Sequence, residues 1–337
     1  MGKNMLIKIY HKVRRRSGYA FGDLKGSLSL NKSLFRHTRG ARIVVYHGLC
    51  EASPTRFNSL FLRAKTFERH LQFYRKYCHI VSLEEYYAGK FSKDRFNICI
   101  TFDDGFANNY KYALPLMNKY EAPMTFFITG IRDAGYDFLW NDFLAFLQNY
   151  GPPEFSLWDD LFYKDRRRGY ASIKTGVLLK DRLREGDFAE KAEMIKLLKP
   201  ILMMKDKGQE ADYWLQMTPD EIKALSASPL ATIGCHGYYH NDLSKISLPA
   251  AEEEMIRSRE YLGRIIDKRV NALAFPYGAY TRELLEAAKR AGFDQLLALD
   301  WLFPEDATED TLRQRLVVNP YISVNNQMTA ILHGKYK

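Results

Sequence analysis

Two neighbouring carboxylates give the first sign of chemistry in this sequence. Asp103 and Asp104 directly follow the apolar run 97–102. Neighbouring residues on an extended backbone point to opposite sides, so one carboxylate can bind a cation while the other stays free as a base. Taken alone, an Asp-Asp-Gly sequence is more typical of a helix N-cap followed by an acid in the first turn.

Two histidines four residues apart, His236 and His240, add to the pattern. On one helical turn such residues face the same side and can close on a single ion, although an isolated pair at this spacing is more often incidental. With Asp104 they make a set of two histidines and one carboxylate, which leaves metal positions open for water and substrate. A structural zinc site would use four protein ligands, and we expect the neighbouring Cys235 to point into a sheet instead.

Strands and helices that alternate along the chain would position these side chains. Short apolar runs predict buried strands at 41–46, 97–102, 124–128, 230–234, 272–275 and 295–299. Helical spacing predicts helices at 66–77, 109–120, 250–266 and 281–291. This order is typical of a parallel sheet buried on both sides, and therefore of an α/β barrel or a doubly wound sheet. In both architectures the active residues follow the carboxyl ends of strands.

One long stretch interrupts this alternation. From about 135 to 229 the sequence shows helical patterns and charge clusters but no convincing strand, which predicts a mostly helical insertion that covers or shapes the cleft. The predicted organisation is a basic extension over residues 1–40, followed by one α/β domain over residues 41–337 that carries this insertion.

Four motifs resemble those of the polysaccharide deacetylase family, also called the NodB-homology or carbohydrate esterase family 4 group. In the family's order they are Thr101-Phe-Asp-Asp-Gly105, Pro123-Met-Thr-Phe-Phe127, His236-Gly-Tyr-Tyr-His240 and Phe275-Pro-Tyr-Gly278. Each motif alone is common, but finding all of them together over residues 41 to 300 is specific. The resemblance implies a distorted, incomplete (β/α) barrel that removes N- or O-acetyl groups from sugars with a zinc or similar divalent ion.

The resemblance also implies roles for single residues. Asp103 matches the catalytic base, and the metal ligands match Asp104, His236 and His240. Tyr277, which follows Pro276, matches the residue whose backbone N–H helps to hold the oxyanion. These roles agree with the chemistry of the residues, because a metal polarises the acyl carbonyl and its water while a carboxylate accepts the proton.

Two positions depart from the family's motifs. Gly237 stands where the family often has Ser or Thr, and Leu273 stands where it often has Arg. Whatever orients Asp103 must therefore come from another part of the chain, or the pKa of this carboxyl is tuned differently.

The proton donor for the leaving amine has two candidates, His47 and His333. In the permuted biofilm-polysaccharide deacetylase branch the strand that bears this acid stands at the front of the domain, and residues 43–47 resemble that opening. His333 lies close to the last residue, where fraying is the default. We therefore predict that His47 is the acid, with a structural histidine as the alternative for either position.

Two aromatic residues are weaker candidates for a substrate-binding role. Trp140 and Trp301 could line a sugar cleft because aromatic faces stack on sugar rings, although a core or capping role explains each of them as well.

Charge and cysteine content bear on location. The net charge is +10, and residues 1–16 mix basic and apolar residues with no acid, which suits either an amphipathic helix on an anionic membrane or a solvated tail. No zinc-finger spacing or RNP-like string supports a nucleic-acid partner. The sequence shows no signal peptide, no membrane span and no CxxC pair, so we expect a cytoplasmic protein, with the inner face of the membrane as one location within that compartment.

The preferred hypothesis is a metal-dependent hydrolase, with zinc as the expected ion, that acts on an N-acylated saccharide of a surface glycan or its lipid-linked precursor. A deformylase or other amidase of the same fold is one alternative. A non-catalytic carbohydrate-binding or scaffolding protein on a degenerate barrel is the other.

Overall fold

Seven parallel strands close into a barrel, in the order β1-β13-β12-β11-β10-β6-β5, with β5 pairing back to β1. The computed structural model describes residues 30–165, 168–200 and 207–336. The barrel strands are β1 (Ala41–Tyr46), β5 (Phe96–Phe102), β6 (Met124–Ile128), β10 (Ala231–Cys235), β11 (Ala272–Ala274), β12 (Gln295–Ala298) and β13 (Leu312–Val317). A complete (β/α) barrel has eight strands, so the predicted incomplete barrel is confirmed.

An eighth parallel strand, β4 (Cys78–Val81), lies beside the barrel. It pairs with the first half of β5, and β6 takes over the same edge of β5 from Ile100 onward. A separate two-stranded parallel sheet joins β2 (Leu49–Cys50) and β3 (Leu62–Arg63). These pairings place the carboxyl ends of β1, β5 and β6 next to one another.

Most of the barrel strands are apolar on both faces. Ile43, Cys99 and Phe127 belong to one buried cluster inside the barrel. Their neighbours Val44 and Phe126 pack in a larger core outside it, against the surrounding helices. Because successive strand residues point to opposite sides, continuous apolar runs are what a sheet covered on both faces requires.

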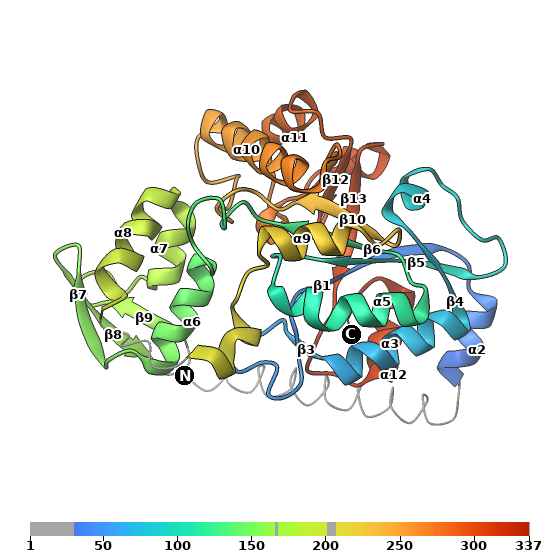
Figure 1. The fold of residues 1–337 in the computed structure, drawn as a ribbon, viewed down its shortest axis with the longest axis horizontal. Coiled ribbons are helices and arrows are strands. Elements are labelled where there is room, and N and C mark those ends of the chain that lie inside the picture. Colours follow the sequence, from blue (N-terminus) through green and yellow to red (C-terminus); the bar gives the residue numbers. More distant parts are fainter. Residues whose placement is uncertain (1–29, 166–167, 201–206, 337) are drawn as a thin grey trace, which may run out of the picture.

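Helices surround the barrel (Figure 1). They are α2 (Leu30–His37), α3 (Ala64–Tyr77), α4 (Leu83–Tyr87), α5 (Leu114–Tyr120), α9 (Pro219–Ser226), α10 (Leu248–Ile266), α11 (Arg282–Arg290) and α12 (Val324–His333). The helix predicted at 109–120 instead begins as a π-helical turn, Asn109–Ala113. Pro115 lies at the start of α5 and has no N–H to give to the carbonyl four residues earlier, which favours the wider turn.

The end of the predicted N-terminal extension is part of the folded domain. Phe35 of α2 is buried, and its ring centroid lies 5.0 Å from that of Phe73 and 5.6 Å from that of Phe96. The basic residues 1–16, for which an amphipathic helix was one prediction, lie outside the described residues.

The segment between β6 and β10 forms a separate lobe (Figure 1). It contains α6 (Trp140–Tyr150), β7 (Glu154–Leu157), β8 (Asp160–Asp165), β9 (Gly169–Ser172), α7 (Leu179–Glu185), α8 (Phe188–Leu198) and a 3-10 helix, Lys207–Tyr213. The insertion contains more helix than strand, as predicted, but the prediction that it has no strand was wrong, because β7, β8 and β9 form an antiparallel sheet.

The sequence did not predict this sheet, because its hairpin turn lacks the residues that usually mark such a turn. Trp158 and Asp159 form the two-residue turn, with φ of 53° and 56°. Such a turn normally takes Asn-Gly or Asp-Gly, since both positions need the left-handed region. The strand β7 does alternate, with Phe155 and Leu157 buried and their neighbours exposed, but it is only four residues long.

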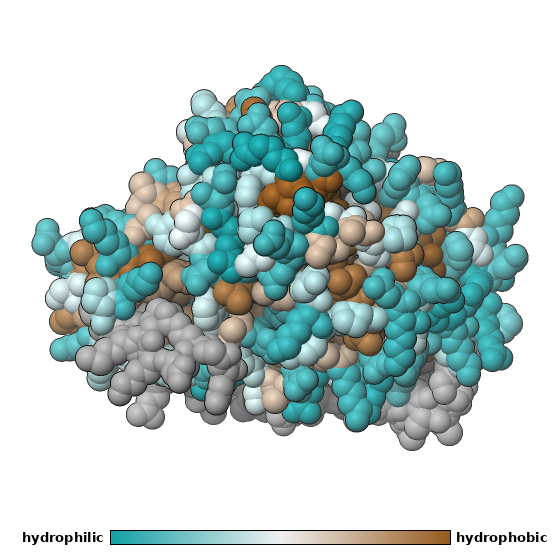
Figure 2. Space-filling view, in the orientation of Figure 1, coloured by the Kyte–Doolittle hydropathy of each residue, from teal (hydrophilic) through white to brown (hydrophobic). Residues whose placement is uncertain are grey.

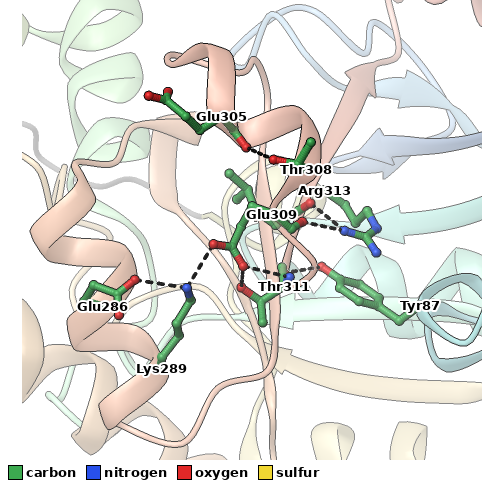
Figure 3. Close-up of polar contacts among 9 residues, drawn as sticks. Tyr87, Glu286, Lys289, Glu305, Thr308, Glu309, Thr311 and Arg313 are labelled. Carbon is green, nitrogen blue, oxygen red and sulfur yellow. Dashed lines mark hydrogen bonds and ion pairs between the residues drawn. The ribbon is translucent and has the colours of Figure 1, made fainter.

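A polar network holds the start of β13 (Figure 3). The Glu309 carboxylate accepts hydrogen bonds from the backbone and hydroxyl of Thr311 and pairs with Lys289 of α11 at 3.0 Å. Arg313 donates to the carbonyl oxygen of Glu309 at 2.9 Å. The hydroxyl of Tyr87, in α4, donates to the carbonyl oxygen of Thr311 at 3.1 Å. These contacts hold β13 in place. The sequence analysis did not predict this strand, because polar residues interrupt its apolar pattern.

The surface is mainly hydrophilic on the face shown in Figure 2, with apolar side chains in separate small groups. In the described part of the chain, none of the helices combines the length and apolar character needed to span a bilayer.

Candidate active site

The three predicted metal ligands meet at the carboxyl ends of β5 and β10. Asp104, His236 and His240 are buried, and their possible ligand atoms all lie within 4.8 Å of one another. The Nε2 atoms of His236 and His240 lie 3.3 and 3.2 Å from the same carboxylate oxygen of Asp104. This arrangement places one oxygen and two nitrogens around a common point.

The tautomer of His236 suits a metal. Its Nδ1 lies 2.8 Å from the carbonyl oxygen of Ala274. Because a carbonyl can only accept, Nδ1 carries a proton, which leaves Nε2 as the ring nitrogen that could bind a metal. Burial raises the pKa of Asp104, but the two histidines outweigh it and hold that pKa well below its usual range.

The loop that carries the histidines is not the helical turn that their spacing suggested. Residues 236–240 follow β10 as irregular backbone, in which Gly237 has φ of 72° and His240 has φ of 58°. The buried Glu254 of α10 accepts hydrogen bonds from the backbone N–H groups of Tyr238 and Tyr239, at 3.2 and 3.0 Å. A left-handed φ at His240 is strained for a residue with a side chain, and such strain is typical of functional sites.

Asp103 forms a bidentate ion pair with Arg315. The two guanidinium nitrogens lie 2.7 and 2.8 Å from the two carboxylate oxygens, and both side chains are buried inside the barrel. Burial acts to raise the pKa of Asp103, but Arg315 and then His236 outweigh it, so the pKa is lowered and the carboxylate stays ionised. Arg315 thus supplies the partner that the sequence lacked at Leu273.

His47 lies beside Asp103 because β1 and β5 are in register. Tyr46 pairs with Phe102, and the backbone N–H of Asp103 donates to the Tyr46 carbonyl oxygen at 2.9 Å. His47, the residue that follows β1, lines the same cavity as Asp103. Burial lowers the pKa of His47, and the two aspartates partly oppose that shift. The other candidate acid, His333, is exposed at the end of α12 and does not line this cavity.

The cavity over the cluster has a volume of about 490 Å³. Barrel residues form most of its wall, and Asn141, Asp142 and Arg184 come from the insertion, which therefore shapes the cleft as expected. Burial, together with the charge of Asp104, raises the pKa of Asp142 well above its usual range.

The predicted oxyanion residue also lies at this cavity. Tyr277 lines it, has φ of 60°, and places its ring centroid 5.1 Å from that of His240. Gly278 follows with φ of 66°, and a Cβ there would lie 2.5 Å from Leu299, so the turn admits only glycine. Pro276 is buried beneath the turn.

The two predicted tryptophans do not line the metal cavity. Trp140 is buried, and its indole N–H donates to the carbonyl oxygen of His240 at 3.0 Å, so it supports the ligand loop from the insertion. Trp301 is 45% exposed and lies outside the cavity wall.

Comparison with known families now adds to the geometry. The family model described as "Polysaccharide deacetylase" matches residues 91–154 and 207–296. The chain contains a polysaccharide deacetylase domain. The unmatched residues 155–206 fall in the lobe between β6 and β10, which agrees with an insertion into that domain. This match supports carbohydrate deacetylation as the general activity. No curated protein matches the sequence.

Solved deacetylases share the fold. The Streptococcus pyogenes deacetylase PplD in complex with acetate is 18% identical, with a TM-score of 0.52 over 87% of this chain and 97% of that one. IcaB from Ammonifex degensii is 18% identical, with a TM-score of 0.51 over 88% and 99%. A de-N-acetylase from Aggregatibacter actinomycetemcomitans is 14% identical, with a TM-score of 0.51 over 84% and 96%.

Proposed function

We propose that this chain is a metal-dependent deacylase that removes an N-acetyl or similar acyl group from an amino sugar. The sugar would belong to a surface glycan or to its lipid-linked precursor. The observation that carries the proposal is the meeting, in one cavity, of a complete ligand cluster with an arginine-held carboxylate and a histidine. A protein that only binds carbohydrate would need no such combination.

The donor set fits a divalent ion. Asp104, His236 and His240 would hold it, and one carboxylate with two imidazoles leaves positions free for water and substrate, as in catalytic zinc sites. When bound, the ion would lower the pKa of a water molecule and polarise the acyl carbonyl.

The remaining groups would move protons. Asp103 would accept the proton of the water that attacks the acyl carbon, and Arg315 would keep that carboxylate ionised and in place. The backbone N–H of Tyr277 would donate to the oxyanion. When the carbon–nitrogen bond breaks, His47 would give a proton to the leaving amine, and the acyl group would leave as a carboxylic acid.

A metal-dependent assay tests the proposal. The purified chain is stripped of metal with a chelator, reloaded with zinc, cobalt, nickel or manganese, and tested for amine release from N-acetylated amino sugars and oligosaccharides. Activity that appears only with metal and disappears in Asp104→Ala supports the proposal. A chain that carries metal and hydrolyses neither these amides nor small acetyl esters would overturn it.

We also propose that the chain works at the cytoplasmic face of a membrane. The basic and apolar residues of segment 1–16 support this placement, since such segments bind anionic lipid. Precursor glycans are assembled on membrane-bound carriers, so this location would suit a lipid-linked substrate.

A further inference from the structure

The loop that carries the histidine ligands contacts three different helices of the insertion through three consecutive residues, 240–242. The carbonyl oxygen of His240 accepts a hydrogen bond from the indole of Trp140, in α6, at 3.0 Å. The buried carboxylate of Asp242 pairs with Arg184, in α7, at 2.7 Å. The residue between these two contacts the third helix, α8, so the insertion holds the loop at a ligand and directly after it.

The contact with α8 comes from a buried lysine. Lys191 is 0% exposed, and its ammonium group donates to the side-chain oxygen of Asn241 at 2.5 Å and to the carbonyl oxygen of Gly186 at 2.7 Å. The same ammonium group lies 5.1 Å from the centroid of the Trp140 ring. Because an ammonium group loses its hydration on burial, lysines are almost never fully buried without partners, and these contacts are the ones that compensate the loss.

Asn241 links this lysine to a second buried charge. Its side-chain nitrogen donates to the carboxylate of Glu254, in α10, at 2.6 Å. One amide therefore accepts from Lys191 and donates to Glu254, which an aspartate, as an acceptor only, could not do. Burial lowers the pKa of Lys191 to about 8, and the charge of Glu254 opposes that shift, so the ammonium group is mostly protonated at pH 7.

The same glutamate holds the loop on the other side of His240. Glu254 accepts hydrogen bonds from the backbone N–H groups of Tyr238 and Tyr239, which precede the ligand, and from the side chain of Asn241, which follows it. His240 itself has φ of 58°. A left-handed residue with a side chain costs about 1–3 kcal/mol and persists only where its surroundings hold it in place. The network that ends at Lys191 supplies such surroundings.

We propose that Lys191 is a positioning residue of the metal site, which acts through Asn241 to keep His240 in the conformation that binds the ion. The inference rests on the proposed function in one respect, since it assumes that the ligand cluster binds a metal, and it assumes no hydrolysis. Helix α8 lies in the segment 155–206 that the family model leaves unmatched. The insertion would therefore contribute to metal binding as well as shape the cleft.

Zinc affinity tests the proposal without a substrate. The chain is stripped of metal and titrated with zinc in a calorimeter, with a competing chelator to bring the Kd into range. Lys191→Met keeps the length of the side chain and removes its donors, so we expect the Kd to rise about tenfold or more, as is typical when an outer partner of a metal ligand is lost. Asn241→Leu should raise the Kd to a similar extent, and it tests the same link where Lys191→Met does not fold. Unchanged zinc affinity in either variant would overturn the proposal.

A double variant shows whether the lysine acts through Asn241. If it does, Lys191→Met combined with Asn241→Leu should bind zinc no more weakly than the weaker of the two single variants, because each change already breaks the same link. If the two losses multiply instead, the residues act independently and the proposed route through Asn241 is wrong.

Two control variants separate positioning from general damage to the lobe. Leu198→Ala removes buried packing from the same helix and no polar contact, so it should lower the thermal stability and leave the Kd for zinc near the parent value. Lys196→Met replaces an exposed lysine of α8 and should change neither. If Leu198→Ala weakens zinc binding as much as Lys191→Met does, the lysine has only a structural role and the proposal fails.

Hydrolysis measured on the same samples separates this inference from the proposed function. If zinc binding depends on Lys191 but the zinc-loaded chain hydrolyses neither N-acetylated sugars nor small acetyl esters, the proposed function fails and the positioning role stands. If the chain hydrolyses these substrates and Lys191→Met binds zinc as the parent does, the positioning role fails alone.

Discussion

Arg315 of β13 holds both carboxylate oxygens of Asp103 at the end of β5, although the two residues lie on strands that do not pair with each other. Strand β1 lies between them, and its Ile43 pairs with Arg315 on one side and with Cys99 on the other. The guanidinium therefore reaches Asp103 across the interior of the barrel, where its carbon lies 5.4 Å from the Phe127 ring centroid. The proposed base is thus ionised and oriented by a residue far from its own motif.

Arg315→Gln should destabilise the fold and impair the base. Losing the guanidinium leaves the buried carboxylate of Asp103 unpaired, which costs about 3–5 kcal/mol of the free energy of unfolding near neutral pH. Chemical denaturation at pH 7 measures this loss. The double variant Asp103→Asn with Arg315→Gln removes both charges, so it should be more stable than Arg315→Gln alone.

The pH dependence of this variant has a defined sign. In the parent chain the pKa of Asp103 is depressed, so the ion pair stabilises the fold above the ordinary carboxyl pKa and this contribution is lost as the pH falls through the depressed value. In Arg315→Gln burial should raise the pKa of Asp103 instead. The stability gap between parent and variant should therefore narrow as the pH is lowered, and the acidic limb of the kcat/KM profile should move to higher pH.

Local patterns predicted the parallel α/β arrangement and a possible ion-binding set, and the resemblance of four motifs to one family then implied the barrel and the roles of the ligands. The apolar run Ala41–Tyr46 and the run that ends at Asp103 each form a strand largely from their own residues, and parallel packing brings their carboxyl ends together. Arg315 could not be predicted in this way. It lies on a strand whose polar residues resemble a surface segment, and its partner is remote in sequence. The role of a buried arginine in a short strand can be recognised only when the residues that surround it in the fold are known.

The insertion was misread for a related physical reason. Its hairpin turns at Trp158 and Asp159, which accept a left-handed φ without the glycine that normally marks such turns. Its role at the site comes from Trp140 and Arg184, whose contacts with the His240 loop, Asp242 and Tyr277 are all between segments far apart in the chain. Contacts of this kind leave no periodic trace in a sequence.

Asp103→Asn and His240→Ala should separate catalysis from metal binding. Asp103→Asn keeps the three ligands but loses the proton acceptor, so we expect bound metal near the parent level and a fall in kcat of about 10²–10⁴-fold. His240→Ala loses a ligand and should lose most of its metal after dialysis. Metal content by elemental analysis, with turnover on the same samples, checks both. Loss of metal in Asp103→Asn would show that this carboxylate is itself a ligand.

Residues 1–16 should bring the chain to anionic membranes. Each basic residue near such a surface contributes roughly 1 kcal/mol at low salt, and the effect falls off within a Debye length. Co-sedimentation should therefore show binding to vesicles that contain phosphatidylserine, weaker binding at high salt and none to neutral vesicles. Deleting residues 1–16 should abolish binding and preserve activity on a soluble substrate. A full-length chain that ignores anionic vesicles at low salt would mean that the segment is an ordinary solvated tail.

His47 and His333 can be distinguished by the leaving group of the substrate. An amine is a poor leaving group without a proton, whereas the alcohol of an activated ester leaves readily, so His47→Ala should slow amide hydrolysis by about 10²–10⁴-fold and ester hydrolysis much less. His333→Ala is the matched control, because His333 is exposed at the end of α12, outside the cavity that His47 lines. Rates on an N-acetylated disaccharide and on an activated acetyl ester should be compared for both variants and the parent.

Because burial lowers the pKa of His47, the parent's amide hydrolysis should also decline as the pH rises, and this limb should be missing from ester hydrolysis. If His47→Ala hydrolyses the amide at the parent rate and His333→Ala hydrolyses it more slowly, His333 and not His47 would be the proton donor.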